Sequence, residues 1–405
     1  MSLSPALEFN PRNRLPRTAA RLAQGGPLTI AYFGGSITQA DGWRTATFNW
    51  FETRYPNVRF TEVPASIGGT GSNLGVYRMD RDLLPHKPDL AFIEFAVNDA
   101  HTSDEVIIGA MEGIVRKIRQ SRPSCEIIFV YTVNSAMTAS LRNGILDRAA
   151  TAHEKVADHY GIPSIHLALE VAKQEGAGSL VFTGTGDEKK ALEAQGKLVF
   201  ARDNCHPYPA GHQLYAEAVI RHLPDLLTPQ GSPVLPLPDP MDPSRWEASR
   251  MATPDALGLT PDWRRLERNE WPPIAWSADS LPQLWLTETP GAGLDLAFTG
   301  TAFGLFLVVG PTSGKIEWSL DGQSPVKFCL FDAWCSFYRP HYQILVHHLE
   351  DGPHRIQIKL RADEPDKAAI LASQKVTIDY LERYQGARFY LAAALITGEL
   401  PPSAR

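Results

Sequence analysis

The sequence has little excess charge of either sign. Its 405 residues include 39 Lys and Arg and 45 Asp and Glu, which leaves a formal net charge of -6. It has no long basic run of the kind that binds nucleic acid or an anionic membrane. Its longest apolar runs, such as 90–97, have the length of a strand and fall far short of the ~20 residues that span a bilayer. We therefore predict a soluble globular protein with neither nucleic acid nor membrane among its partners.

Cysteine is also scarce. The four cysteines are Cys125, Cys205, Cys329 and Cys335. They are too few and too unevenly spaced for a disulfide framework or a C-x-x-C metal site, and no H-E-x-x-H motif is present. Cys329 and Cys335 would pair only in an exported protein, so we expect free, mostly buried thiols. Neither a metal nor a cofactor is predicted.

The first 26 residues lack the uninterrupted apolar core that a secretory signal needs. We therefore expect a cytoplasmic protein. The opening "MSL" leaves one alternative, in which a native leader has been replaced.

A chain of this length exceeds what one hydrophobic core supports, which predicts two to three domains. Within residues 27–228, short runs rich in Ile, Val and Phe alternate with longer amphipathic runs, a pattern typical of parallel strands joined by crossover helices. We assign residues 1–228 to this domain. We predict strands at 28–34, 58–63, 90–97, 126–133 and 162–167 and helices at 43–54, 73–84, 104–121, 139–160 and 210–224. This rhythm indicates a doubly wound α/β domain.

From about residue 229 the sequence changes to "TPQGSPVLPLPDPMDPSRW", which is too rich in proline for a helix or a central strand. We assign 229–280 to a linker and connecting segment. Residues 281–405 show alternating patterns with turn signals, including a hairpin turn expected at Asp351-Gly352. They predict an accessory all-β sandwich with a jelly-roll-like arrangement.

Polar residues follow three of the predicted strands. In an open parallel sheet, ligands bind beyond the carboxyl ends of the strands. Ser36 follows the first strand, the glycine-rich loop 65–72 follows the second, and Asn98 follows the third. Two glycines before a serine often make only a turn. Here, however, a nucleophile and oxyanion donors converge at one edge of the sheet, as acyl-enzyme chemistry requires.

The base that a nucleophilic serine needs is offered by "ARDNCHPYPAGH", in which Asp203 stands three residues before His206. An aspartate at this spacing on a loop can bind the imidazole Nδ1 and fix its tautomer. A second D-x-x-H, ending at His354, lies in the predicted hairpin and is assigned to structure. Thr38 occupies the fifth position of the G-x-S-x-G elbow, which argues against an α/β-hydrolase.

These pieces, in this order, resemble the SGNH hydrolases, also called the GDSL family of esterases and lipases. Gly35 stands where that family often has aspartate, and Gly69 matches its key glycine, with Gly68 the alternative. The four matching blocks are "FGGSIT", "IGGTGS", "FAVND" and "DNCHP" followed by "AGH".

The resemblance implies a flavodoxin-like three-layer fold and a Ser-His-Asp mechanism without a cofactor. Ser36 would be the nucleophile, His206 the general base and then acid, and Asp203 the residue that orients His206. The oxyanion hole would consist of the N–H groups of Ser36 and Gly69 and the side-chain amide of Asn98.

An SGNH domain followed by a β-sandwich resembles bacterial carbohydrate esterases that remove acetyl groups. We therefore expect hydrolysis of short-chain acyl esters, most plausibly acetyl, on a small-molecule or oligosaccharide substrate. The alternatives are an acyltransferase, a lipase or thioesterase of the same family, and a non-catalytic carbohydrate-binding protein.

Aromatic residues near the motifs are candidate substrate contacts, namely Trp43, Tyr77 and Tyr208. The aromatic segment 331–342 fits equally well a binding surface or loop lining the cleft, or a core strand and turn.

Three charged residues near the motifs have structural interpretations that we favour. We interpret Glu94 as a strand-end or solvent-facing carboxylate rather than as support for a site loop. Arg78 is expected in a surface ion pair, and Asp99 is expected to cap the segment that follows it.

Overall fold

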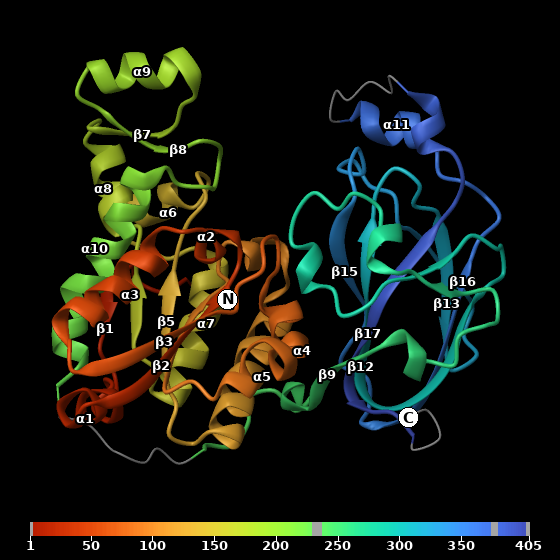
Figure 1. The fold of residues 1–405 in the computed structure, drawn as a ribbon, viewed down its shortest axis with the longest axis horizontal. Coiled ribbons are helices and arrows are strands. Elements are labelled where there is room, and N and C mark those ends of the chain that lie inside the picture. Colours follow the sequence, from red (N-terminus) through yellow and green to blue (C-terminus); the bar gives the residue numbers. More distant parts are fainter. Residues whose placement is uncertain (1–2, 229–236, 374–379, 402–405) are drawn as a thin grey trace. The chain divides into compact units, whose positions relative to one another are not determined.

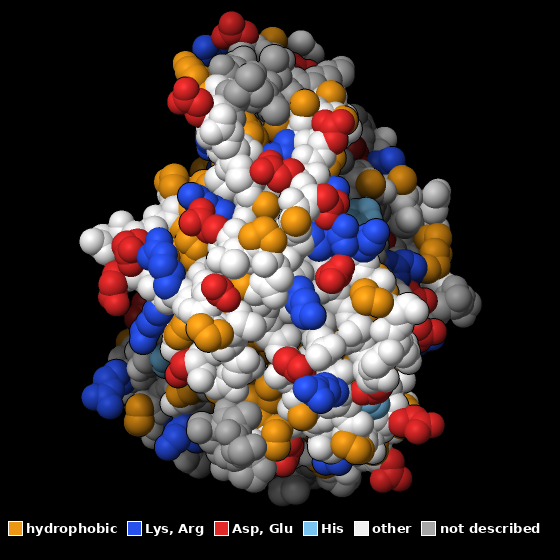
Figure 2. Space-filling model, turned by 90° about the vertical axis from the view of Figure 1, so that its right-hand side faces the viewer, with side chains coloured by type: hydrophobic (Ala, Val, Ile, Leu, Met, Phe, Trp, Pro, Cys, Tyr) orange, Lys and Arg blue, Asp and Glu red, His pale blue; other side chains and the backbone are white. Residues whose placement is uncertain are grey.

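The computed structural model describes residues 3–228, 237–373 and 380–401. The chain divides into two units, Met1–Glu247 and Ala248–Arg405, and each is described by itself (Figure 1). On the face shown in Figure 2, the described Lys and Arg side chains lie interspersed with Asp and Glu.

The first unit is built on a six-stranded sheet with the order β1-β6-β5-β4-β2-β3. Its strands are β1 (Phe9–Asn10), β2 (Gly26–Gly34), β3 (Val58–Pro64), β4 (Leu90–Glu94), β5 (Glu126–Tyr131) and β6 (Ser164–His166). All pairs are parallel except β1 with β6. The five parallel strands follow the flavodoxin-like order, in which the winding reverses between β2 and β4. The predicted doubly wound domain is confirmed.

Helices cover both faces of this sheet (Figure 1). Helices α3 and α10 pack together on one face, and α4, α5 and α7 pack side by side on the other. Right-handed crossovers require this division, because the chain moves outward from β2 to β3 and then back past β2 to β4. The helices are α1 (Pro16–Gln24), α2 (Ser36–Gln39), α3 (Trp43–Arg54), α4 (Ser72–Asp82), α5 (Asp104–Ser121), α6 (Thr138–Arg142), α7 (Arg148–Tyr160) and α10 (Pro209–Leu226).

Two local features differ from the sequence prediction. The helix expected at 139–160 is split into α6 and α7, because Gly144 takes a φ of 75° and the Asp147 side chain caps the N-terminus of α7. After β6 the chain makes an excursion that the sequence analysis missed. It consists of α8 (Leu169–Gly176), β7 (Leu180–Thr183), α9 (Gly186–Ala194) and β8 (Leu198–Ala201), and β7 and β8 form a separate two-stranded parallel sheet.

Part of the predicted linker packs on the first unit. The Trp246 ring is buried against α5, where a Cβ added to Gly109 would lie 2.3 Å from Trp246 Nε1. The Glu112 carboxylate accepts the backbone N–H groups of Met241 and Asp242 at 2.6 and 2.8 Å. Residues 237–247 are therefore held by the first unit. The stretch 229–236 lies outside the described residues.

The second unit is an antiparallel all-β domain, as predicted. Its sheet has the order β10-β11-β17-β12-β16-β13-β14, with β15 paired to β12 and β9 paired to β17. The elements are β9 (Ser249–Ala252), β10 (Arg264–Arg265), β11 (Trp285–Thr287), β12 (Gly293–Val309), β13 (Lys315–Leu320), β14 (Val326–Cys329), β15 (Arg339–Val346), β16 (Gly352–Leu360), α11 (Lys367–Ala372) and β17 (Phe389–Glu399). Strands β9 and β10 fall within the segment assigned to the linker, because strands of two to four residues are too short to show alternation.

The long strand β12 joins the two halves of this sheet. Its residues 293–300 pair with β16, and residues 303–309 pair with β15. Both β15 and β16 therefore pair with β12. The prediction of a hairpin at Asp351-Gly352 is wrong. Alternate side chains of β12 and β16, among them Phe303, Leu305 and Ile356, form the core. His354 binds Asp321 and the carbonyl of Glu350, a structural role as predicted.

Candidate active site

Ser36 opens α2 directly after β2, in a turn that requires two glycines. A Cβ on Gly34 would lie 2.4 Å from the carbonyl oxygen of Glu94, and a Cβ on Gly35 would lie 2.0 Å from Asn98 Oδ1. Any larger residue would therefore displace Glu94 or Asn98. This crowding accounts for glycine at position 35, where the family that the sequence resembles often has aspartate.

Ser36, His206 and Asp203 form one hydrogen-bonded chain. His206 Nε2 lies 2.9 Å from Ser36 Oγ, and His206 Nδ1 lies 2.9 Å from Asp203 Oδ2. Asp203 Oδ1 also accepts the backbone N–H groups of Cys205 and His206 at 2.8 and 2.6 Å. These bonds close the tight turn after β8 and hold the carboxylate beside the ring. The fold thus joins two motifs that lie 170 residues apart.

The charge on Asp203 is stabilised by its turn. Partial burial acts to raise the pKa of this carboxyl, but the hydrogen bonds from the His206 backbone and ring and from Cys205 outweigh burial and hold the pKa below its usual range. The side chains of His206 and Asp203 are 34% and 45% exposed. The lowered pKa favours the carboxylate form of Asp203. The exposure shows that water can reach both side chains.

Asn98 and Gly69 are the two further groups that the sequence predicts as oxyanion donors. Asn98 begins the 3₁₀ turn Asn98–His101 after β4, and its side chain lies against Gly35. Gly69 has a φ of 73°, and its N–H makes no hydrogen bond to the residues that the structure describes. The N–H of Gly68 instead donates to Gln39 Oε1 at 2.9 Å. Of the two candidate glycines, Gly69 is therefore the one with an available donor.

Asp99 ties the Asn98 turn to the glycine-rich loop. Its Oδ1 accepts the N–H of Ser72 at 2.9 Å, and its Oδ2 lies 2.8 Å from His153 Nε2. Asp99 therefore caps α4, whereas the sequence analysis expected it to cap the segment that follows it. Capping across the sheet fixes Asn98 relative to the loop that contains Gly69.

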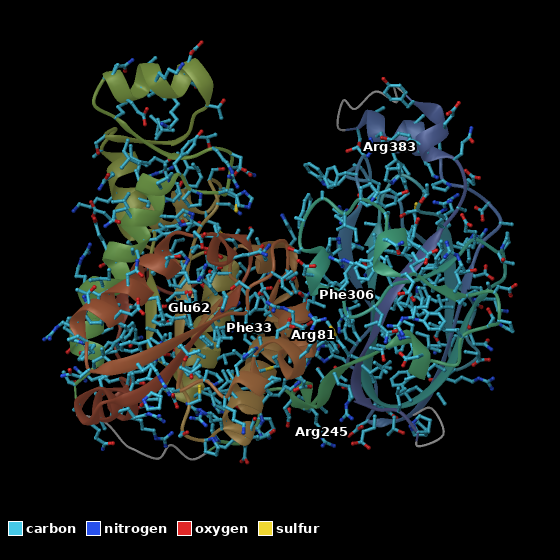
Figure 3. All side chains as sticks on the ribbon, in the orientation of Figure 1. Phe33, Glu62, Arg81, Arg245, Phe306 and Arg383 are labelled. Carbon is cyan, nitrogen blue, oxygen red and sulfur yellow. The ribbon has the colours of Figure 1, made fainter. Side chains whose placement is uncertain are left out.

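Arg78 is buried rather than in a surface pair, although it does bind Asp82. Its guanidinium donates to the carbonyl oxygens of Ala65 and Gly34 at 2.6 and 3.2 Å and lies 4.1 Å from the ring centroid of Phe33, which Figure 3 labels. Burial lowers the pKa of Arg78 to about 10, while the nearby Asp82 acts to raise it. Arg78 thus fixes the strand ends that precede the Ser36 turn and the glycine-rich loop.

The prediction of substrate contact is wrong for two of the three aromatic candidates. The Trp43 and Tyr77 residues are 0% and 1% exposed, because α3 and α4 turn these side chains inward. Trp43 packs edge-on against Tyr32, and Tyr77 packs against Trp246, so neither can stack on a substrate. Tyr208 is only partly buried, and its hydroxyl donates to the carbonyl of Gly184 at 3.2 Å. It stays a candidate.

The aromatic segment 331–342 contributes both to the core and to the surface of the second unit. Phe331 and Tyr338 are buried. Trp334 is 59% exposed, and Trp276, which is 43% exposed, packs on Phe337 with ring centroids 5.1 Å apart. The core interpretation therefore holds for part of the segment, and a binding role for its exposed part stays a prediction.

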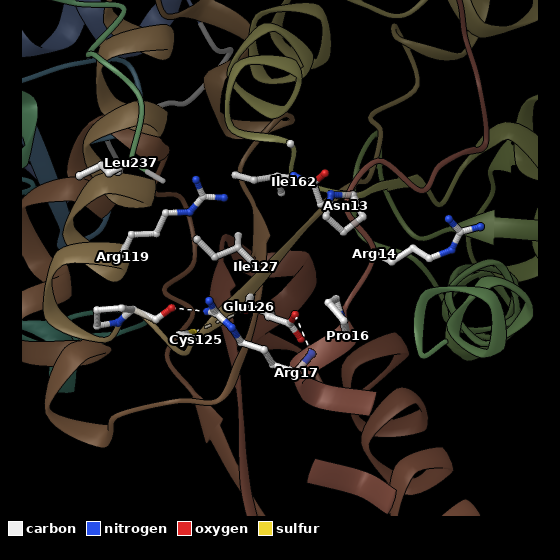
Figure 4. Close-up of a pocket in the computed structure, with 13 residues that line it drawn as sticks. Asn13, Arg14, Pro16, Arg17, Arg119, Cys125, Glu126, Ile127, Ile162 and Leu237 are labelled. Carbon is white, nitrogen blue, oxygen red and sulfur yellow. Dashed lines mark hydrogen bonds between the residues drawn. The ribbon is translucent and has the colours of Figure 1, made fainter. Parts of the chain in front are cut away.

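A cavity of about 240 Å³ lies at the other end of the parallel sheet (Figure 4). Its lining includes the start of β5 and the residues just before β6, with Glu126, Arg17 and Arg119. Arg17 donates to the Pro123 carbonyl, and Glu126 accepts the backbone N–H of Arg17 at 3.0 Å. Ser36 follows the carboxyl end of β2, so this cavity is separate from the site.

The thiol nearest to the site is Cys205. All four cysteines are free, with Cys125 and Cys335 buried. Burial raises the pKa of Cys205 to about 12, and the carboxylates of Glu94 and Asp203 add to the shift. Cys205 is therefore a neutral thiol that does not compete with Ser36 as a nucleophile.

Within the described residues, no group of three or more His, Cys, Asp or Glu side chains is placed to hold a metal ion. Over the same ranges, the helices are all too short or too polar to cross a membrane.

Residues 32–214 match the model of the GDSL-like Lipase/Acylhydrolase family. This range contains Ser36, Asn98, Asp203 and His206. This match supports a carboxylic ester hydrolase. The N-terminal unit therefore contains a GDSL-like lipase/acylhydrolase domain.

Two solved structures are similar over nearly the whole chain. A two-domain esterase (CEX) active on acetylated mannans, co-crystallised with mannopentaose, is 21% identical with a TM-score of 0.72, over 98% of this chain and 100% of that one. A second structure of a two-domain esterase (CEX) active on acetylated mannans is 22% identical with a TM-score of 0.70, over 96% and 99%. The shared feature is the fold, an α/β domain followed by an antiparallel β domain. No curated protein matches the chain.

Two buried histidines of the first unit indicate that the folded protein loses stability in acid. Burial lowers the pKa of His166 to about 3, and burial with nearby Arg202 and His206 lowers that of His212 to about 4. The unfolded chain binds these protons near pH ~6.5, before the folded chain does. We therefore expect stability to be full above this pH and to fall as the pH drops from ~6.5 through 4.

Calorimetry between pH 7 and 4 checks this expectation. His212 Nδ1 accepts the N–H of Trp43 at 3.4 Å, a role that the amide oxygen of His212→Asn can take. Between pH 7 and 4, the melting temperature of this variant should fall less than that of wild type. His159→Asn, at an exposed site, should keep the wild-type dependence. Equal dependence in wild type and His212→Asn would contradict the assignment.

Proposed function

We propose that the chain hydrolyses short-chain acyl esters, above all acetyl esters of carbohydrates, through a Ser36-His206-Asp203 triad and an acyl-enzyme. The observation that carries the proposal is the continuous hydrogen-bonded chain from Ser36 Oγ through the His206 ring to Asp203 Oδ2. It lies beside the point where the winding of the sheet reverses, a common ligand site in this class of fold.

In the acylation step, Ser36 Oγ attacks the acyl carbon while His206 Nε2 takes its proton. Asp203 holds Nδ1 as the N–H tautomer and stabilises the imidazolium that forms. The oxygen of the tetrahedral intermediate is bound by the N–H groups of Ser36 and Gly69 and by the amide of Asn98. His206 then gives its proton to the leaving alcohol, and the acyl group stays on Ser36.

In the deacylation step, His206 removes a proton from water as the water oxygen attacks the acyl carbon, and His206 then gives that proton to Ser36 Oγ as the acyl–Oγ bond breaks and the acid leaves. The partial exposure of His206 and Asp203 supports hydrolysis over acyl transfer, because transfer requires that water be kept from the acyl-enzyme. Transfer to an acceptor alcohol is the alternative that the same chemistry allows.

Two observations support a carbohydrate substrate. Two structures that are similar over both units are of esterases active on acetylated mannans. The second unit exposes Trp334 and the Trp276–Phe337 pair, and indole rings of this kind stack on sugar rings. An acetylated oligosaccharide is therefore the substrate that we propose.

Release of acetate from acetylated mannan and acetylated xylan, compared with hydrolysis of p-nitrophenyl acetate, butyrate and octanoate, tests this proposal. We expect acetate release from at least one polysaccharide. We also expect kcat/KM for the acetyl ester to exceed that for the butyryl ester roughly tenfold or more, because each added methylene that a pocket excludes costs a comparable factor. A preference for octanoate would indicate a lipase. Transfer of the acyl group to an added alcohol would indicate an acyltransferase, and binding of the polysaccharide without turnover would indicate a binding protein.

A further inference from the structure

A carboxylate lies beneath the Ser36 turn. Glu94 is the last residue of β4, in a strand whose residues are all buried, and it is 1% exposed. Of the two expected forms, the strand-end carboxylate is confirmed, whereas the solvent-facing one is wrong because the side chain is buried. A carboxylate in this position is costly unless donors satisfy it.

Three donors from two different loops satisfy Glu94. The Thr38 hydroxyl donates to Oε2 at 2.8 Å, and the Thr132 hydroxyl donates to Oε1 at 2.7 Å. The backbone N–H of Gly35 donates to the same carboxyl group. Gly35 and Thr38 belong to the turn after β2, on either side of Ser36, whereas Thr132 directly follows β5.

The contacts continue from Thr132 toward the His206 loop. The next residue, Val133, donates its N–H to the Tyr215 hydroxyl at 3.2 Å, and the N–H of Ser135 donates to the carbonyl of Asn204 at 2.9 Å. Asn204 lies between Asp203 and His206. Glu94 therefore links the Ser36 turn to the segment 132–135. That segment in turn contacts the loop that contains His206.

We infer that Glu94 is a positioning residue for the nucleophile, fixing the Ser36 turn so that Oγ faces His206 and the N–H of Ser36 faces the oxyanion. The inference rests on the proposed function. Gly34 agrees with this role, because a Cβ there would meet Glu94.

Stability alone does not explain this carboxylate. Burial raises the pKa of Glu94, while the Thr132, Thr38 and Gly35 hydrogen bonds act to lower it. A buried charged group is often replaceable by apolar packing without loss of stability. Its use here is geometric, because one rigid planar group holds three donors at fixed directions.

A matched pair of variants separates positioning from structural support. Glu126 lies at the start of β5, at the other end of the sheet, and is also held by hydrogen bonds, from the backbone N–H groups of Arg17 and Thr18 at 3.0 and 2.7 Å. Burial also raises the pKa of Glu126. We expect Glu94→Gln to lower kcat for p-nitrophenyl acetate by roughly 10- to 100-fold with KM nearly unchanged, because small displacements of a nucleophile cost factors of this size. Glu126→Gln should lower the melting temperature without changing kcat.

Rescue by a conservative variant gives a second measurement. Thr132→Ser keeps the hydroxyl and should keep kcat, whereas Thr132→Val removes it and should lower kcat in the direction of Glu94→Gln. The rate of Ser36 labelling by a fluorophosphonate should follow the same order. Wild-type labelling at Ser36 with an unchanged Glu94→Gln rate would overturn the positioning role alone. Absence of wild-type labelling and turnover would overturn the proposed function and this inference with it.

Discussion

Ser36→Ala is expected to lower kcat/KM for p-nitrophenyl acetate by about 10⁴-fold or more, because removing the nucleophile of such a triad leaves only binding and oxyanion stabilisation. The lost atom is the Oγ that lies 2.9 Å from His206 Nε2. The side chain is small and opens a four-residue helix, so the fold should persist. Initial rates measured with circular dichroism on the same samples check both parts.

Ser179→Ala serves as the control for this variant. The Ser179 hydroxyl donates to the carbonyl of Gln174 at the surface, before β7. The control should keep the wild-type rate. If Ser36→Ala keeps most of the rate as well, the nucleophile is another group.

Asn98→Ala is expected to lower kcat by roughly 10²- to 10³-fold with little change in KM, because an oxyanion donor acts mainly in the transition state. Gly35 cannot carry a Cβ beside Asn98, so the site already brings this side chain against the Ser36 turn. Steady-state kinetics on the acetyl ester, analysed for kcat and KM separately, measures the effect.

Asn143→Ala is a matched control on an exposed turn of the same unit. It should leave both constants unchanged. A rise in KM at constant kcat in Asn98→Ala would place the amide in ground-state binding instead of the oxyanion hole.

Much of the first unit could be predicted because its elements repeat one simple pattern. The apolar residues of 104–121 and 43–54 recur at helical spacing, and α5 and α3 lie over these same residues. The run that contains β4 is apolar because helices cover both faces of a parallel sheet. The position of Ser36 and Asn98 beyond the strand ends follows from the topology alone.

What could not be predicted depends on long-range contacts. Trp43 and Tyr77 carry no local sign that their helices face inward at these positions. Glu94 and Arg78 are buried because partners from distant loops satisfy them, and composition gives no signal for such partners. The part of the excursion at 180–201 consists of two strands of four residues around an exposed helix, and strands of that length are too short to show periodicity.

The contribution of the linker region to both units escaped prediction for a related reason. Trp246 was included in the proline-rich stretch, but its burial depends on Gly109 and Gly113 of α5, more than a hundred residues earlier. A glycine pair one turn apart on a helix marks a place where a large ring can approach, and this signal was available in the sequence.

Trapping the acyl-enzyme tests the central claim most directly. The protein is mixed with p-nitrophenyl acetate, quenched in acid within the burst phase, digested and analysed by mass spectrometry. The account predicts one added acetyl group on the peptide that contains Ser36, and fragmentation should locate this group at Ser36. The acetylated fraction should increase in His206→Ala when this variant slows deacylation more than acylation. An acetyl group on another residue, with Ser36 unmodified while turnover proceeds, would contradict it.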